Sequence, residues 1–67
     1  MDPIDTIKLL EQAIEAERQA QDRYREGVER AADPETRALF QQLLQWEKEH
    51  ERLLNDRLAT FRLLEGR

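Results

Sequence analysis

The chain has 67 residues, enough for one small domain, and a domain of this size buries only about 60% of the surface that its unfolded chain exposes, so self-association is expected. Acidic residues outnumber basic ones by 15 to 11, and the net charge of -4 argues against a nucleic-acid partner, whose phosphates attract basic patches. The same negative charge disfavours binding to an anionic membrane surface, and no apolar run approaches the roughly 20 residues of a membrane span. The absence of cysteine excludes disulfides, thiolate metal sites and thiol catalysis.

The first predicted element is a helix over about residues 3–31. Asp2 precedes Pro3, and this pair is typical of a helix N-terminus, because the carboxylate can cap free backbone N–H groups and proline lacks an N–H where none is needed. The segment that follows is rich in Ala, Leu, Glu, Gln and Arg, which favour a helix. Gly27 is its only poor helix former.

A second helix is predicted over about residues 34–64. Asp33 and Pro34 repeat the signal for a helix start, and Gly66 is placed to end the helix in a left-handed conformation. Because the connection around residues 32–33 is very short, the two helices are predicted to be antiparallel neighbours in one domain, residues 1–67. The predicted fold class is therefore all-α, an antiparallel two-helix hairpin.

Both predicted helices carry a stripe of residues spaced alternately three and four apart, which is typical of a helix-bundle seam. The stripe of the first helix is apolar with polar interruptions and consists of Ile7, Leu10, Ile14, Glu17, Gln21, Tyr24, Val28 and Ala31. The stripe of the second consists of Phe40, Leu43, Glu47, His50, Leu54, Arg57, Phe61 and Leu64. Further apolar residues flank this second stripe, with Leu44 and Leu58 on one side and the row Leu39, Trp46 and Leu53 on the other. One partner helix cannot cover so wide a face, so at least two copies are expected to form a four-helix bundle.

Three polar residues of the stripes are predicted to lie at one height in the hairpin. Counted from residue 33, Glu17 lies 16 residues back, whereas Glu47 and His50 lie 14 and 17 residues forward. At about 1.5 Å per residue these offsets differ by only a few ångström. A buried, unpaired carboxylate is costly and normally takes up a proton, a cation or a metal. The three side chains are therefore the candidate metal ligands and catalytic residues.

Pairing of two hairpins would bring two copies of this ligand set together. Bundles that bind two iron or manganese ions use one Glu from each of two helices and a Glu-x-x-His from each of the other two. Here that motif is Glu47-Lys48-Glu49-His50, whose spacing puts both ligands on one helix face. Four ionised glutamates would balance the charge of two divalent ions. Oxygen-rich coordination with one imidazole per ion and no sulfur favours Fe(II) or Mn(II) over structural zinc or copper.

From about residue 7 to residue 54 the sequence resembles a ferritin-like, rubrerythrin-type half-bundle. The resemblance is carried by Glu17 followed by Tyr24, by the helix start Asp33-Pro34-Glu35, and by the Glu47-Lys48-Glu49-His50 motif. Among two-helix proteins of this type it is most similar to the encapsulated ferritins, whose chains dimerise to complete a ferroxidase centre and assemble into rings. The resemblance implies a di-iron site held by Glu17, Glu47 and His50 of two chains, with Tyr24 hydrogen-bonded to a ligand carboxylate.

The function that this resemblance implies is oxidation of Fe(II) by oxygen or peroxide, for iron storage or detoxification, in a homodimer or a higher homo-oligomer. Encapsulated ferritins reach their encapsulin shell through a C-terminal targeting peptide. The residues after Leu64 do not form one, so the shell is not carried over as a partner. The expected location is the cytoplasm, with a protein nanocompartment as the alternative.

Other interpretations stay open. The chain could be a helical oligomerisation module with a structural or vestigial metal site, or a metal-free hairpin whose buried Glu and His only set its register. Rubrerythrin-like peroxide reduction would need an external electron donor, because a chain without cysteine has no rubredoxin module. Taken alone, His50 is more often a surface histidine. Gln21 and Arg57 are interpreted as positions where the seam frays or meets another subunit, and Glu51 as a solvated residue.

Overall fold

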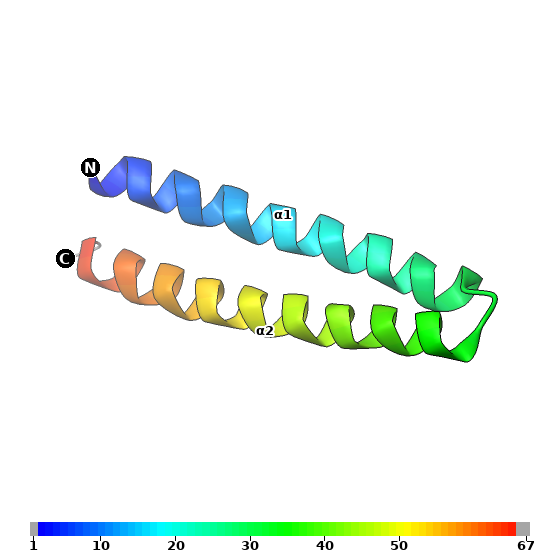
Figure 1. Cartoon of the computed structure of the whole chain (residues 1–67). Helices are drawn as coiled ribbons and strands as arrows, with labels where there is room; N and C mark the ends of the chain where they lie inside the picture. Colours follow the sequence, from blue (N-terminus) through cyan, green and yellow to red (C-terminus); the bar gives the residue numbers. More distant parts are fainter. Residues whose placement is uncertain (1, 66–67) are drawn as a thin grey trace.

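The computed structural model of the chain describes residues 2–65, which form two long helices joined by a short connection. Helix α1 comprises Pro3–Arg30 and helix α2 comprises Pro34–Glu65. The helices lie side by side and antiparallel, so the start of α1 and the end of α2 are at the same end of the hairpin (Figure 1). The predicted all-α hairpin is confirmed. Helix α1 ends one residue before the predicted limit, and the predicted terminator Gly66 lies outside the described residues.

Each helix begins at a proline that follows a capping aspartate. Asp2 Oδ1 accepts a hydrogen bond from the backbone N–H of Ile4 at 2.8 Å, and Asp33 Oδ2 accepts one from Thr36 at 2.8 Å. These bonds satisfy N–H groups that have no partner within the helix. Because the Thr36 N–H favours the ionised carboxylate, the pKa of Asp33 lies below its usual value.

The turn between the helices is closed by contacts from both sides. The backbone N–H of Ala31 donates to the carbonyl of Gly27 at 2.9 Å and ends α1. From α2, the Arg37 guanidinium reaches back and donates to the carbonyl of Ala31 at 3.1 Å. The short connection therefore places α2 antiparallel to α1. The resulting hairpin is elongated and measures 51 × 15 × 15 Å along its principal axes.

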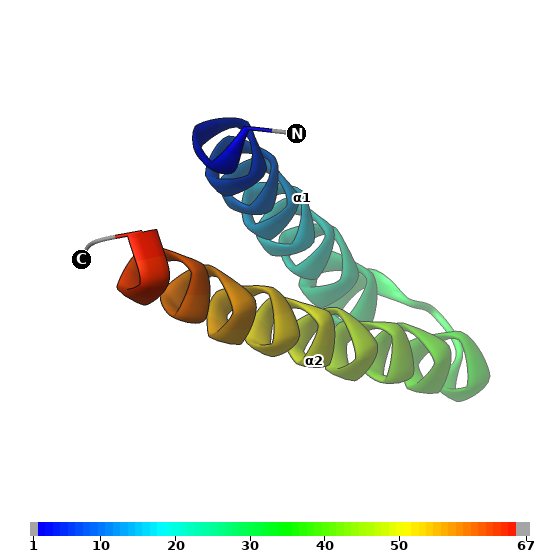
Figure 2. The same cartoon turned by 90° about the vertical axis from the view of Figure 1, so that its left-hand side faces the viewer.

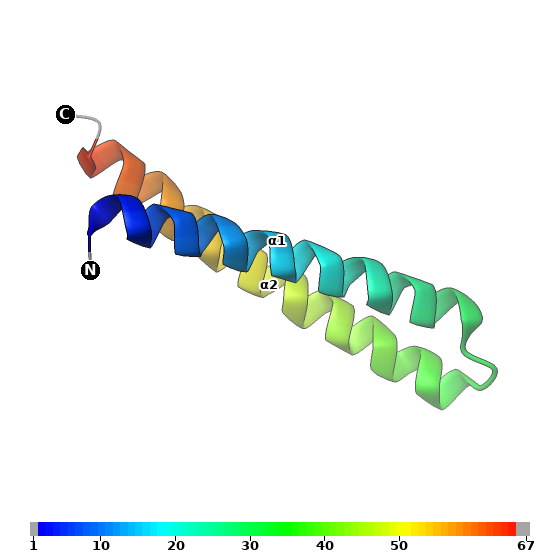
Figure 3. The same cartoon turned by 90° about the horizontal axis from the view of Figure 1, so that it is seen from above.

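The described residues form a single layer of two helices. Viewed along its length, the pair has no third element over either outer face (Figure 2), and from above α1 and α2 cross at a shallow angle (Figure 3). Among the described residues few are buried, namely Ile14, Ala20, Gln21 and Leu58, each 5–8% exposed. Neither described helix has a segment long and apolar enough to cross a membrane.

The face that α2 turns toward α1 differs from the predicted stripe. All residues of the predicted first stripe are buried or half-buried, but His50, Arg57 and Leu64 of the α2 stripe are exposed. In their place Leu44, Glu51 and Leu58 lie at the interface, and Leu58 is only 7% exposed. Helix α2 is therefore rotated relative to the prediction. The row Leu39, Trp46 and Leu53 remains 52–55% exposed.

Near the turn, the helices approach each other closely at Gly27. A Cβ atom built on Gly27 would lie 2.5 Å from Cγ of Phe40, an atom close to the backbone of α2 that cannot swing away. The Phe40 ring also packs against Tyr24, with ring centroids 6.3 Å apart and planes at 34°. The one poor helix former of α1 is thus the residue that makes room for Phe40.

Replacing Gly27 with alanine is expected to destabilise the chain. Alanine gains up to about 1 kcal/mol in helix propensity, whereas forcing an extra methyl group into a packed contact costs about 1–3 kcal/mol. We expect a lower melting temperature for Gly27→Ala at fixed protein concentration, and recovery when Phe40→Leu is added. A higher melting temperature for Gly27→Ala alone would show that the close contact with Phe40 does not exist.

Candidate metal centre

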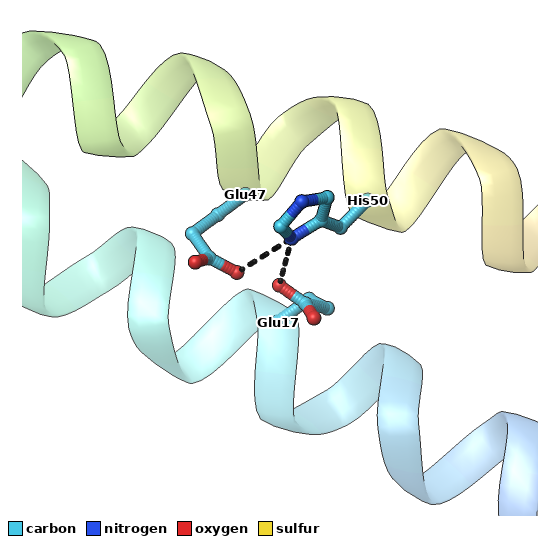
Figure 4. Close-up of side chains that lie close together, drawn as sticks. All are labelled: Glu17, Glu47 and His50. Atoms are coloured by element: carbon cyan, nitrogen blue, oxygen red, sulfur yellow. Dashed lines mark ion pairs between the residues drawn. The ribbon is translucent and has the colours of Figure 1, made fainter.

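The three predicted ligands meet across the helix interface. Glu17 projects from α1 toward Glu47 and His50, which project from α2 (Figure 4). One ligand atom from each residue lies within 4.8 Å of the others. His50 Nδ1 is 3.5 Å from Glu47 Oε2 and 3.6 Å from Glu17 Oε2. The side chains that the sequence places at one height are therefore close together, while their role as metal ligands stays a prediction.

Local structure accounts for this convergence. Glu47 and His50 are three residues apart in an uninterrupted helix, so both point to the same side of α2. Glu17 comes from the middle of α1, where the antiparallel pairing brings it opposite them. All three side chains therefore project from regular helices, which fix the positions of ligands more precisely than loops do.

The burial of the two carboxylates suits a cation. The side chains of Glu17 and Glu47 are only 22% and 18% exposed, whereas that of His50 is 53% exposed. Within the described part of the chain, Glu17 Oε2 is a buried oxygen with no hydrogen-bond partner. An orphaned buried carboxylate oxygen calls for a proton or a positive ion. Two carboxylates and one imidazole without sulfur are ligands suited to Fe(II) or Mn(II), so the residues present fit such an ion.

A polar cluster beside the three ligands was not predicted from the sequence. Gln21 is 5% exposed and donates from Nε2 to Glu51 Oε1 at 2.6 Å. Glu51 Oε2 accepts from Arg18 Nε at 3.2 Å. The pKa of Glu51 lies below its usual value, mainly because of the hydrogen bond from Gln21 and secondarily because of that from Arg18.

Two interpretations from the sequence are corrected by this cluster. Gln21 does not mark a frayed seam, because it is among the most buried of the described residues, while its contact with another subunit stays a prediction. Glu51 is not simply solvated, since both of its oxygens are engaged by hydrogen bonds. The position of Gln21 within the α1 stripe was a usable signal of burial. Its partner could not be identified, because the rotation of α2 that turns Glu51 inward is not encoded in the stripe.

Tyr24 lies on α1 two helical turns from Glu17 and contacts Phe40. Its ring packs against Phe40, and Glu17 Oε2 has no hydrogen-bond partner, so in the single chain the Tyr24 hydroxyl does not reach that oxygen. The hydrogen bond from Tyr24 to a ligand carboxylate therefore stays a prediction for the assembled protein.

A helical hairpin that brings a Glu of one helix against a Glu-x-x-His of the other corresponds to half of a carboxylate-type metal bundle. Residues 8–66 match the family model of rubrerythrin, and the chain therefore belongs to the rubrerythrin family, in the ferritin-like superfamily. Domains of this type bind iron. The chain is similar to an uncharacterized protein of Archaeoglobus fulgidus, with 49% identity over 57 residues that cover 85% of this chain and 89% of that protein. No solved structure matches the chain significantly.

Proposed function

We propose that the chain oxidises Fe(II), its substrate, at a di-iron site formed between two copies. The observation that carries this proposal is the buried, unpartnered Glu17 Oε2 that faces Glu47 and His50. Bound Fe(II) would give up an electron and become Fe(III), and dioxygen or peroxide would take up the electrons together with protons. Membership of a family whose domains bind iron supports the choice of metal, and Mn(II) is the alternative ion for the same ligands.

Each ligand has a distinct part in the proposal. Glu17 and Glu47 supply the oxygens that hold Fe(II) and favour its conversion to the harder Fe(III) ion, and His50 supplies one nitrogen. Which carboxylate would bridge two ions is left open. Residues 2–65 of a single chain bring these three side chains together, so coordination positions would stay free for a second copy's ligands and for the oxidant.

The two sides of α2 support a second copy as the partner. On one side, ion pairs cross to α1, with Arg62 Nη2 at 2.9 Å from Glu11 Oε2 and Arg18 Nε at 3.2 Å from Glu51 Oε2. The other side carries the exposed apolar row Leu39, Trp46 and Leu53. His50 lies on this apolar side, four residues after Trp46 and three before Leu53, and its side chain is 53% exposed.

A second copy seated on the apolar row would cover it and complete the metal site at the same time. Exposed apolar rows on a small chain mark interaction surfaces. Two-fold pairing also brings two Glu17, two Glu47 and two His50 together, and two divalent ions would neutralise the four carboxylates. A homodimer is therefore proposed as the minimal functional unit. The encapsulated-ferritin subtype, higher rings, an encapsulin shell and a cytoplasmic location stay predictions.

Anaerobic loading with Fe(II) followed by addition of oxygen tests the proposal. We expect about one iron per chain, and oxidation of Fe(II) well above its rate in buffer. Metal binding to the folded state also raises stability, by about 2.7 kcal/mol at a concentration of 100 times the dissociation constant, so Mn(II) should raise the melting temperature.

The other outcomes identify the alternatives. Metal binding without oxygen consumption would indicate an oligomerisation module with a structural site. Turnover of peroxide only when an electron donor is added would indicate peroxide reduction. Failure to bind either ion would refute the proposed function altogether.

A further inference from the structure

We propose that Gln21 is a positioning residue for the metal centre, because its hydrogen bond to Glu51 sets the register in which Glu17 meets Glu47 and His50. This inference rests on the proposed function. It assigns a role to a buried polar side chain that is not itself a ligand.

Gln21 and Glu51 each lie one helical turn from a ligand, in opposite directions along the hairpin because the helices are antiparallel. Gln21 follows Glu17 by four residues on α1, and Glu51 follows Glu47 by four residues on α2. Residues at this spacing are neighbours on the same side of a helix. The 2.6 Å bond from Gln21 Nε2 to Glu51 Oε1 is thus a directional contact between the helices that spans the level of the pair of carboxylates.

The side chain of Gln21 is satisfied at both ends of its amide. Its Nε2 donates to Glu51, and its Oε1 accepts from Arg25 Nη2 at 3.2 Å. Glu51 is held in turn by Arg18 at 3.2 Å and by Asn55 at 3.4 Å through its other oxygen. Both carboxylate oxygens of Glu51 are therefore engaged, which keeps this residue out of the metal-ligand set although it adjoins His50.

Register matters here because the ligands tolerate little displacement. The three ligand atoms lie within 4.8 Å of one another, whereas a slip of one helical turn would move Glu17 by about 5.4 Å along α2. Aliphatic side chains along the seam pack without strong directionality. A single polar residue within an apolar seam specifies register, and it does so at a cost in stability. The contacts of the turn lie far from the ligands, so the nearest directional contacts between the helices are those that Glu51 makes with Gln21 and Arg18. Of these two donors Gln21 is the buried one, because the side chain of Arg18 is 57% exposed.

The melting temperature of the metal-free chain distinguishes a positioning role of Gln21 from a merely structural one, because a residue that only stabilises the fold would lower it when replaced. Gln21→Leu places an apolar side chain of similar size in a buried seam position. Glu51 keeps its bonds to Arg18 and Asn55 through Oε2, and because its side chain is 22% exposed, water replaces Gln21 at Oε1. We therefore expect the metal-free melting temperature of Gln21→Leu to be equal to or above that of the unaltered chain. We also expect its dissociation constant for Mn(II) to rise by roughly 10- to 100-fold, as is typical when a residue that supports metal ligands is lost.

The experiment is Mn(II) titration of the full chain, followed by the electron paramagnetic resonance signal of free and bound Mn(II), with thermal melting of the metal-free form. The exchange variant Gln21→Glu with Glu51→Gln keeps a hydrogen bond between the two positions and should restore both the affinity and the bound-state spectrum. The matched control is Glu11→Gln, which removes another interhelical contact, that with Arg62 at 2.9 Å, and should leave Mn(II) affinity unchanged.

The outcomes distinguish this inference from the proposed function. If the unaltered chain does not bind Mn(II) or Fe(II), the metal function falls and the inference falls with it. If the unaltered chain binds and Gln21→Leu binds equally well, only the positioning role of Gln21 is overturned. If Gln21→Leu loses affinity in step with a lower melting temperature, and Glu11→Gln does the same, the effect is one of general stability and the inference is again wrong.

Discussion

Replacing Glu17 with glutamine is expected to abolish stoichiometric binding and oxidation of Fe(II). The substitution keeps the shape of the side chain but removes the charge of a buried oxygen that has no other partner. Loss of a direct ligand should weaken Mn(II) binding by at least about 100-fold, since even residues that only support ligands are worth 10- to 100-fold. Calorimetric titration with Mn(II) and oxygen uptake after Fe(II) loading measure the two effects.

The same variant carries an internal control on folding. Because a buried, unpaired carboxylate opposes folding, the metal-free melting temperature of Glu17→Gln should not fall, and circular dichroism should show unchanged helicity. Glu47→Ala and His50→Ala are expected to lose oxidation in the same way. Glu49→Gln alters an exposed carboxylate between them that pairs with Arg52, and it should oxidise Fe(II) normally. Undiminished oxidation by Glu17→Gln, Glu47→Ala and His50→Ala would overturn the assignment of the site.

Replacing Trp46 with glutamate is expected to convert the protein to a monomer and thereby to remove Fe(II) oxidation. Trp46 is 52% exposed in the single chain and lies at the centre of the apolar row between Leu39 and Leu53. A buried tryptophan at the centre of an interface is typically worth about 2 kcal/mol or more, which is roughly 30-fold in the dissociation constant. A buried glutamate adds a desolvation cost. Analytical ultracentrifugation measures the oligomeric state, and oxygen uptake measures the activity.

The matched control for Trp46→Glu is Gln45→Glu. It introduces the same charge at the neighbouring exposed position, which points away from the apolar row because adjacent residues on a helix do not share a face. Gln45→Glu should remain associated and active. A monomeric Trp46→Glu that still oxidises Fe(II) at the original rate would show that one hairpin contains a complete site. An unaltered chain that is monomeric at all concentrations would show that no second copy covers the row.

Assembly and metal loading are coupled in this proposal. In a single hairpin, Glu17 Oε2 has no hydrogen-bond partner and the row Leu39, Trp46 and Leu53 is exposed to water. Dimerisation around bound metal would cover the row and give this oxygen a cation. Binding of ions that only the dimer can hold should therefore strengthen the dimer by mass action.

The sequence alone determined where the helices begin and which residues reach the same height. The starts are local, because an aspartate followed by proline caps a helix whatever surrounds it, and both starts are found where they were predicted. The convergence of Glu17 with Glu47 and His50 follows from a regular rise per residue counted from a short turn, so it too could be derived without coordinates. The spacing of the stripe likewise gave most of the interface residues of α1, although the buried Ala20 lies outside it.

Only the tertiary structure decided how α2 is rotated against α1. Helix α2 has apolar residues on several adjoining rows, so periodicity does not select among them, and the choice depends on how side-chain volumes fit together. That fit turns Leu58 and Glu51 inward and leaves Arg57 outside, and it places Phe40 against the space above Gly27. The bond between Gln21 and Glu51 is a consequence of this rotation. The spacing of residues along the sequence shows which of them share a face of one helix. Which faces of α1 and α2 meet is decided by how the side chains of the two helices pack together.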